Sequence, residues 1–175
     1  MLVQIQSQQD AAIPFIQQLY ETSFPQHERR DWMQVMYLLA HPPMQLHLIR
    51  DGLQKVGFAI RWQLGAAWYL EHFAVDAALR GQQYGSRVLR EILAASPDQL
   101  VLEVEPPFDD MSQRRIRFYE RHGLLLAPFT YHQPPYRRQE PPVLMRLMSR
   151  PAIVLEAEMA LIARTISETV YEPYQ

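Results

Sequence analysis

Hydrophobic residues recur along this chain with two periods, one typical of helices and one typical of strands. Apolar runs and alternating apolar residues predict strands over residues 2–5, 46–50, 55–62, 69–75, 99–105, 124–127 and 143–148. Apolar residues three or four positions apart predict helices over residues 10–20, 28–40, 85–95, 111–122 and 155–166. This order favours an α/β protein with a mixed sheet and helices on both of its faces.

Turn and capping residues set the predicted ends of these elements. Asp10 can cap the first helix, and Phe24-Pro25 ends it. The second helix should stop at His41-Pro-Pro43, because the residue before a proline disfavours the helical conformation. Asp51-Gly52 is a hairpin turn signal between two strands. A proline- and tyrosine-rich segment joins the last two strands and is predicted to be a loop.

The segment after Arg150-Pro151 carries a further amphipathic helix. Its apolar face repeats at helical spacing and consists of Leu155, Met159, Ile162 and Ile166. We divide the chain into a domain over residues 1–149 and a C-terminal extension over residues 150–175. The extra helix can pack on its own domain, as a single short helix more often does, or on a second subunit. The protein is therefore expected to be a monomer or a homodimer.

The composition narrows the class of protein. A chain of 175 residues with 48% hydrophobic residues is ordinary for one globular domain. A net charge of −2 predicts no general attraction to nucleic acid or to an anionic membrane. Cysteine is absent and the six histidines show no metal-ligand spacing, so we expect no disulfide, no thiolate nucleophile and no metal. No signal peptide or membrane-length apolar run is visible, which predicts a cytoplasmic protein.

The stretch from Tyr69 to Leu93 carries the most chemical information. A buried strand over residues 69–75 leads into a loop with two glycines and an arginine, and an amphipathic helix follows. The first N–H groups of a helix have no partner within it, and the helix dipole is positive at that end. Such a strand–loop–helix unit suits a phosphate or pyrophosphate group.

This loop resembles the acyl-CoA pyrophosphate loop of the GNAT N-acyltransferases, whose usual pattern is Arg/Gln-x-x-Gly-x-Gly/Ala. Its residues are Arg80, Gly81, Gln82, Gln83, Tyr84, Gly85 and Ser86. Arg80 and Gly85 match the first and sixth positions of the pattern, whereas Gln83 stands where glycine is usual. If this position needs a positive φ, a residue other than glycine costs about 1–2 kcal/mol there. The sequence leaves that conformation open.

A second block supports the resemblance at the spacing that the family has. The strand Leu102-Glu103-Val104 precedes a helix that ends in Tyr119-Glu120 and Gly123, similar to the Leu-Glu-Val strand and Tyr-Glu-x-x-Gly-Phe helix of GNAT proteins. Ser112 stands where many members have asparagine. Two further segments resemble an uncharacterised subset of small-molecule or peptide acetyltransferases, FPxxERR at Phe24–Arg30 and QPPY at Gln133–Tyr136.

The resemblance implies the GNAT fold, a central, mostly antiparallel sheet with helices on both faces, here with an extra C-terminal helix. It also implies direct transfer of an acetyl group from acetyl-CoA to an amine. The loop over residues 80–86 and Ser112 would bind the cofactor. Backbone N–H groups around Phe73 and Val75 would hold its pantetheine arm and polarise the thioester carbonyl.

Tyr119 matches the position of the family's general acid. Its phenol stays protonated at neutral pH and can donate a proton to the departing thiolate. The alternative is a core tyrosine on an amphipathic helix, since Ile116 lies three residues before it.

Two acidic residues compete for the role of general base. Alternation along the strand over residues 99–105 places Val101, Glu103 and Glu105 on one face. A carboxylate on a buried strand costs free energy unless it is paired or hydrated, which indicates a water-lined cleft. Glu103 matches the Glu of the family's strand. Glu71 is likewise a carboxylate on a strand predicted to be buried, the preceding one, and is the second candidate. For each of them a structural ion pair is the alternative.

The acceptor stays open. The segments over residues 24–30 and 131–138 should flank its binding site, and they can equally be rigid loops that pack on each other. We expect a small-molecule or peptide amine, which includes a peptide N-terminus, an aminosugar, an amino acid or a polyamine. A polyamine would favour an acidic cleft, and four arginines in these segments argue against it: Arg29, Arg30, Arg137 and Arg138.

A non-catalytic acyl-CoA-binding sensor or partner module is the alternative to an enzyme. The departures at Gln83 and Ser112 favour such a module, and the retention of Tyr119, Glu103 and Glu71 opposes it. We therefore expect an acetyl-CoA-dependent N-acetyltransferase.

Overall fold

The computed structural model describes residues 1–41 and 43–174 of the chain. In this part there are eight strands and five α-helices, so the predicted α/β class is confirmed. The chain forms two compact units. The first comprises Met1–Gln63 and Leu70–Ala95, and the second comprises Leu64–Tyr69 and Ser96–Gln175. The predicted boundary between residues 149 and 150 stays a prediction.

The strands of the first unit follow one another in the order β1-β2-β3-β4. They are β1 (Leu2–Gln4), β2 (Met44–Asp51), β3 (Gln54–Leu64) and β4 (Ala67–Val75), of which the ends at the β3–β4 turn belong to the second unit. β1 pairs with β2 and β2 with β3, both antiparallel. Gly57 allows β3 to approach β4, because a Cβ atom there would lie 2.1 Å from the carbonyl oxygen of Ala74.

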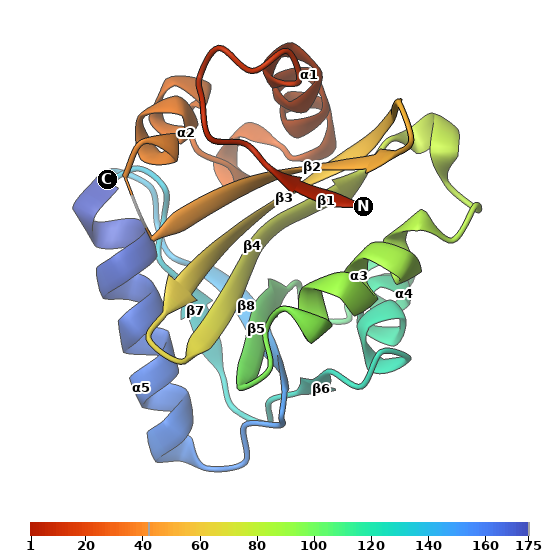
Figure 1. The fold of residues 1–175 in the computed structure, drawn as a ribbon. Helices are drawn as coiled ribbons and strands as arrows, with labels where there is room; N and C mark the ends of the chain where they lie inside the picture. Colours follow the sequence, from red (N-terminus) through yellow and green to blue (C-terminus); the bar gives the residue numbers. More distant parts are fainter. Residues whose placement is uncertain (42, 175) are drawn as a thin grey trace. The chain divides into compact units, whose positions relative to one another are not determined.

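Helices cover both faces of these strands. Figure 1 shows α1 (Ile13–Ser23) and α2 (Trp32–Leu39) over one face and α3 (Tyr84–Ala94) on the other. Each helix buries an apolar stripe, which for α3 consists of Tyr84, Val88, Leu89 and Ile92. Cover on both sides explains why β2 and β3 contain runs of buried residues instead of strict alternation.

Strand β8 (Val143–Arg150) organises the second unit. It pairs antiparallel with β5 (Gln99–Val104), β6 (Leu125–Leu126) and β7 (Tyr131–Gln133). The helices α4 (Asp110–Glu120) and α5 (Glu156–Ile166) flank these strands on opposite sides (Figure 1). After α5 the chain continues through a π-helical turn, Ser167–Tyr171, and a 3₁₀ turn, Glu172–Tyr174.

The second predicted helix is wrong at its N-terminal end. Gln26–Glu28 is a 3₁₀ turn, Arg29 is extended with φ −148° and ψ 157°, and α2 begins only at Trp32. The Arg30 side chain is buried, and its backbone N–H donates to the Tyr20 hydroxyl at 2.8 Å. These tertiary contacts outweigh the local helix propensity. The predicted stop at residues 41–43 includes Pro42, which lies outside the described residues.

Two smaller predictions also need correction. The N-cap of α1 is Ala12, and the carboxylate of Asp10 accepts a hydrogen bond from the Ala12 N–H at 2.8 Å, before the helix begins. The segment predicted to be only a loop contains β7, because the backbone of residues 131–133 pairs with β8. Short strands of this kind are specified by their partner strand more than by their own sequence.

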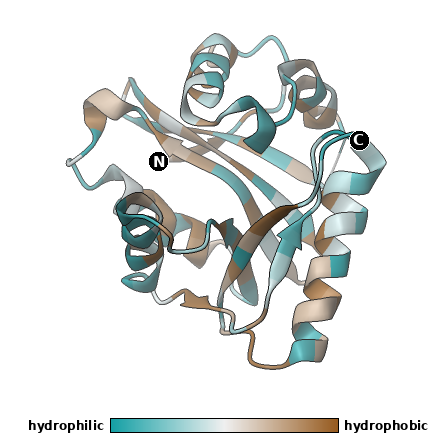
Figure 2. Ribbon diagram, turned by 180° about the vertical axis from the view of Figure 1, so that it is seen from behind, coloured by the Kyte–Doolittle hydropathy of each residue, from teal (hydrophilic) through white to brown (hydrophobic). Residues whose placement is uncertain are grey.

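The C-terminal helix is present as predicted. Met159, Ile162 and Ile166 of α5 are buried, whereas Leu155 precedes the helix and is 64% exposed. Glu158 accepts a hydrogen bond from the Gln99 amide of β5 at 3.1 Å. Figure 2 shows hydrophobic and hydrophilic segments alternating along α5, as expected of an amphipathic helix. Within the described residues no helix has the length and apolar character needed to span a membrane.

Candidate functional site

The loop before α3 has an unusual backbone conformation. Gly81 has a φ of 81° and Gln83 a φ of 61°, and Gln83 is the only residue other than glycine with a positive φ in the described part of the chain. Gln83 is also the N-cap of α3, and no side chain caps this helix. The first turn carries no acidic residue. Gln83 therefore adopts the left-handed conformation that glycine adopts at no steric cost.

The side chains at the start of α3 contact the β2–β3 turn. Tyr84 is buried, and its hydroxyl donates to Oδ2 of Asp51 at 3.1 Å. Nη1 of Arg87 lies 3.4 Å from the same oxygen. Arg80 is exposed. Tyr84 can therefore offer its backbone N–H to a ligand of the loop, while its side chain fixes the loop to the sheet.

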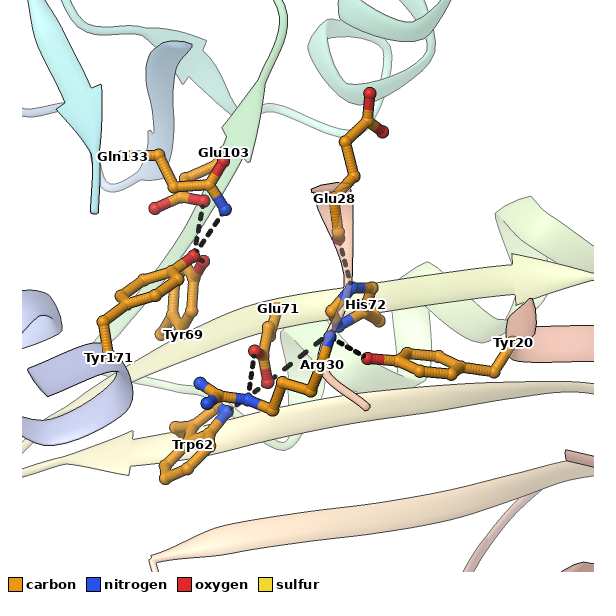
Figure 3. A network of polar contacts seen from close by, with 10 residues as sticks. All are labelled: Tyr20, Glu28, Arg30, Trp62, Tyr69, Glu71, His72, Glu103, Gln133 and Tyr171. Carbon is orange, nitrogen blue, oxygen red and sulfur yellow. Dashed lines mark hydrogen bonds and ion pairs between the residues drawn. The ribbon is translucent and has the colours of Figure 1, made fainter. Parts of the chain in front are cut away.

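Glu71 on β4 forms a buried ion pair with Arg30 (Figure 3). Nε of Arg30 donates to Oε1 of Glu71 at 3.0 Å, and Nε1 of Trp62 donates to Oε2 at 2.6 Å. The side chains of Arg30 and Glu71 are 2% and 1% exposed. The guanidinium group also lies 5.4 Å from the centroid of the Trp62 ring, within cation–π range. Each oxygen of the Glu71 carboxylate thus has a strong donor.

His72 and Tyr20 extend this cluster with neutral groups. Nε2 of His72 lies 3.1 Å from the carbonyl oxygen of Glu28, and the ring packs edge-on against Tyr20 and Phe24. Burial lowers the pKa of His72, so its imidazole is uncharged at neutral pH. Burial, followed by the charge of Glu71, raises the pKa of Tyr20 and keeps its phenol protonated.

A second polar network surrounds Glu103 on β5 and is built mainly from tyrosines (Figure 3). The Tyr131 hydroxyl donates to Oε1 of Glu103 at 2.5 Å, and the Tyr171 hydroxyl donates to Oε2 at 3.0 Å. The oxygen of Tyr171 also lies 3.0 Å from the Tyr69 hydroxyl and accepts from Nε2 of Gln133 at 2.7 Å. Burial, followed by the charge of Glu103, raises the pKa of Tyr131 well above its usual value. Protonated phenols therefore hold this carboxylate.

Tyr119 lies on the buried face of α4. Its ring contacts Phe118, with 5.2 Å between the ring centroids. No residue of the described chain forms a hydrogen bond with its hydroxyl. Burial raises the pKa of Tyr119 to about 12, so the phenol is protonated at neutral pH.

Ser112 and Glu105 have local partners. Ser112 forms a capping box at the start of α4, because its N–H donates to Asp109 Oδ1 at 2.7 Å and its Oγ accepts from the Asp109 N–H at 3.2 Å. β5 ends at Val104, and Glu105 beyond it forms an ion pair with Arg115 of α4. Glu105 is therefore not a strand residue beside Glu103.

Three of the four arginines in the segments over residues 24–30 and 131–138 have partners within the chain. Arg29 donates through Nε to the carbonyl oxygen of Phe24 at 3.0 Å, and Arg30 pairs with Glu71. Nη1 of Arg137 lies 3.4 Å from the Glu140 carboxylate. The positive charge that disfavoured a polyamine acceptor is thus partly compensated.

The sequence matches the family model of the acetyltransferase (GNAT) family over residues 13–124. The chain belongs to this family. A solved structure from Bacteroides thetaiotaomicron, described as a GNAT-family acetyltransferase, is 32% identical, with 98% of each chain covered and a TM-score of 0.90. No curated protein sequence matches the chain. The protein is therefore an acetyl-CoA-dependent acyltransferase with the predicted fold.

More distant structures share the fold. An aminoglycoside 6′-N-acetyltransferase complexed with coenzyme A is 15% identical, covers 85% of this chain and 95% of its own, and has a TM-score of 0.60. A spermidine N-acetyltransferase from Vibrio cholerae is 9% identical, covers 85% of this chain and 93% of its own, and has a TM-score of 0.64. At these identities the likeness concerns the fold and leaves the acceptor of this acetyltransferase open.

The predicted site residues of the acetyltransferase fall into two groups. The first unit contains Glu71, Phe73 and Val75 on β4 together with the loop over residues 80–86, and the second contains Glu103, Ser112 and Tyr119. Their roles stay predictions. The sequence did not indicate the partners of the two glutamates, which are Arg30, Trp62, Tyr131 and Tyr171. Two of these partners, Arg30 and Tyr131, lie in segments that the sequence analysis had singled out.

The left-handed residue at the start of α3 can be tested by substitution. We expect Gln83→Gly to raise the free energy of unfolding by about 1 kcal/mol, because glycine removes the strain of a positive φ. Urea denaturation measures the change. Gln82→Gly is the matched control: its φ is not positive, so the variant should lose stability through the greater freedom of the unfolded chain. A loss of stability in both variants would contradict strain at Gln83.

The buried ion pair can be tested in the same way. Glu71→Gln keeps the shape of the side chain but removes the negative charge 3.0 Å from the buried Arg30 guanidinium, and we expect it to lower the free energy of unfolding by about 3 kcal/mol. Glu140→Gln removes the half-exposed partner of Arg137 and should cost about 0.5 kcal/mol. Equal small losses would show that the ion pair contributes little to stability.

Proposed function

We propose that this acetyltransferase moves the acetyl group of acetyl-CoA directly to a primary amine of a small-molecule or peptide acceptor. In this reaction the N–C bond forms, the thioester C–S bond breaks, one proton leaves the amine and one reaches the thiolate. The observation that carries the proposal is the loop over residues 80–86, whose backbone has the form expected of a pyrophosphate site.

Three features of this loop support a phosphate ligand. The helix that it opens has no side-chain cap and no acidic residue in its first turn, so nothing in its own sequence neutralises the positive end of the dipole. Left-handed residues at positions 81 and 83 let successive N–H groups turn toward one anion. Arg80 adds an exposed cation. We assign all seven loop residues to this ligand, Arg80, Gly81, Gln82, Gln83, Tyr84, Gly85 and Ser86.

Three other residues are also assigned to acetyl-CoA, because they match cofactor-binding positions of the family pattern. Backbone N–H groups around Phe73 and Val75 would hold the pantetheine arm and polarise the thioester carbonyl, which stabilises the oxyanion that forms there. Ser112 is assigned to the cofactor as well, with its hydroxyl also serving the α4 capping box.

Tyr119 is the proposed general acid. With a pKa of about 12 its phenol carries a proton throughout the neutral range. The hydroxyl has no hydrogen-bond partner among the described residues, so its proton is not committed to a structural contact. A phenol in this state can donate to a thiolate as the C–S bond breaks.

Glu103 is the proposed general base. Its carboxylate accepts a hydrogen bond from a phenol at each oxygen, and a phenol donates without adding a charge of its own. Glu71, the competing candidate, is 1% exposed, and a proton arriving on it would break a buried ion pair. We therefore assign proton acceptance to Glu103 and a structural role to Glu71.

The acceptor is proposed at the level of its reacting group. Internal partners for Arg29, Arg30 and Arg137 reduce the case against a polyamine, so amino acids, aminosugars, peptides and polyamines are all retained. The relatives that are named for aminoglycoside and spermidine acceptors suit such a panel. A cytoplasmic location, a monomeric or homodimeric state, and the absence of nucleic-acid, membrane and metal partners stay predictions.

Acetyl-CoA binding and turnover are the first test. We expect isothermal titration to give micromolar affinity for acetyl-CoA and for CoA, because both carry the pyrophosphate that the loop would hold. Thiol release should then be measured with a panel of amines: glycine, glucosamine, spermidine and an alanine-initiated tripeptide. No binding at millimolar acetyl-CoA would overturn the proposal. Binding without turnover on any amine would favour the non-catalytic sensor.

The acid can be tested on the same assay. We expect Tyr119→Phe to lower kcat about a hundredfold and to leave the Kd for acetyl-CoA unchanged, because only the proton donor is removed. Tyr37→Phe, which removes a phenol that is exposed on α2, is the matched control and should behave as the wild type. Unchanged kcat in a folded Tyr119→Phe variant would assign this tyrosine to the core alone.

A further inference from the structure

Tyr171 links the C-terminal turn to the carboxylate that we propose as the base. It belongs to the π-helical turn Ser167–Tyr171 that follows α5, and it lies 68 residues from Glu103 in the sequence. Its side chain is fully buried, and its hydroxyl lies 3.0 Å from Oε2 of Glu103 (Figure 3). Irregular helical turns of this kind are frequent at functional sites.

The donors and acceptors in this network determine the direction of its hydrogen bonds. The amide nitrogen of Gln133 can only donate, so the Tyr171 oxygen accepts this bond at 2.7 Å. An ionised carboxylate can only accept, so the single proton of Tyr171 points to Glu103. The Tyr69 hydroxyl, 3.0 Å from the Tyr171 oxygen, must then donate to it. The Tyr171 oxygen thus accepts from Gln133 and Tyr69, and its own proton is donated to Glu103.

Three other elements lie around Glu103. β7 supplies the Tyr131 phenol, and the start of β4 supplies Tyr69 behind Tyr171. On β8 the residue paired with Glu103 is Leu147. The neighbouring Arg146 pairs with Val104, whose side chain points to the opposite face, and its Nη2 donates to the carbonyl oxygen of Ala127. Two phenols, Tyr131 and Tyr171, therefore each donate a hydrogen bond to Glu103.

We propose that Tyr171 is a positioning residue for Glu103, which makes the C-terminal extension part of the catalytic machinery. The inference rests on the proposed role of Glu103 as the base. The Tyr171 proton fixes one oxygen of the carboxylate and stabilises its ionised form, so the other orientations and the protonated form are less populated. An extension that only completed the core would have no such effect on the carboxylate.

The test compares Tyr171→Phe with the wild type on the amine that gives the highest rate. We expect kcat to fall about tenfold with the KM for acetyl-CoA unchanged. The acid limb of the kcat profile should move to higher pH, because a carboxylate that loses a donor holds its proton more tightly. Tyr37→Phe is the control and should leave both quantities unchanged, since this phenol is exposed on α2.

A second readout does not depend on turnover. The carboxyl carbon of Glu103, labelled with ¹³C and assigned by its loss in Glu103→Gln, should titrate at higher pH in Tyr171→Phe than in the wild type. If the phenylalanine variant fails to fold, replacement of Tyr171 by 3-fluorotyrosine, a more acidic phenol of nearly the same shape, should move both the titration and the acid limb to lower pH.

The outcomes separate this inference from the proposed function. A Tyr171→Phe variant that is less stable but has an unchanged titration and acid limb would overturn the inference and leave the acetyltransferase reaction intact. Full turnover in Glu103→Gln would overturn both the base assignment and this inference, again without affecting the reaction itself. If no amine is acetylated, the function fails, and the ¹³C titration alone decides whether Tyr171 controls the carboxylate.

Discussion

The buried charge of Glu71 is the constraint on which the first unit depends. A carboxylate whose side chain is only 1% exposed would cost several kcal/mol without partners. Arg30 and Trp62 supply one donor for each of its oxygens. On either side of Arg30 the backbone is extended, at Arg29 and at Asp31, and α2 begins at Trp32. The ion pair thus supplies a partner for the buried carboxylate of β4 and is associated with the start of α2 at Trp32.

Glu103 meets the same requirement with different chemistry. Two phenols donate to it, one to each oxygen of the carboxylate. Opposite charge favours the ionised form more strongly than a neutral donor does, and a carboxylate in a buried ion pair is therefore the weaker proton acceptor. This contrast is the physical reason for assigning proton transfer to Glu103 and structure to Glu71. It also gives the C-terminal extension a role beyond packing.

Local patterns predicted the regular elements well. Periodic apolar runs gave the positions of most strands and helices, and the spacing of residues in the strand–loop–helix unit around residues 69–93 pointed to the family. The errors concern Arg29, Asp10 and β7. At Arg29 and β7 a partner distant in sequence or a neighbouring strand overrode the local preference, which a pattern of nearby residues does not contain. At Asp10 the error is local, because its carboxylate accepts from the Ala12 N–H before the helix begins.

The sequence by itself determined the family, the fold and the candidate residues, because these depend on spacing along the chain: a loop at the start of a helix, a Leu-Glu-Val strand and a tyrosine near a helix end. Only the tertiary structure decided the conformation of Gln83 and the partners of the two glutamates. Arg30 and Tyr171 lie 41 and 68 residues from the carboxylates that they contact. Such contacts depend on how the whole chain buries its polar groups, and no local pattern specifies them.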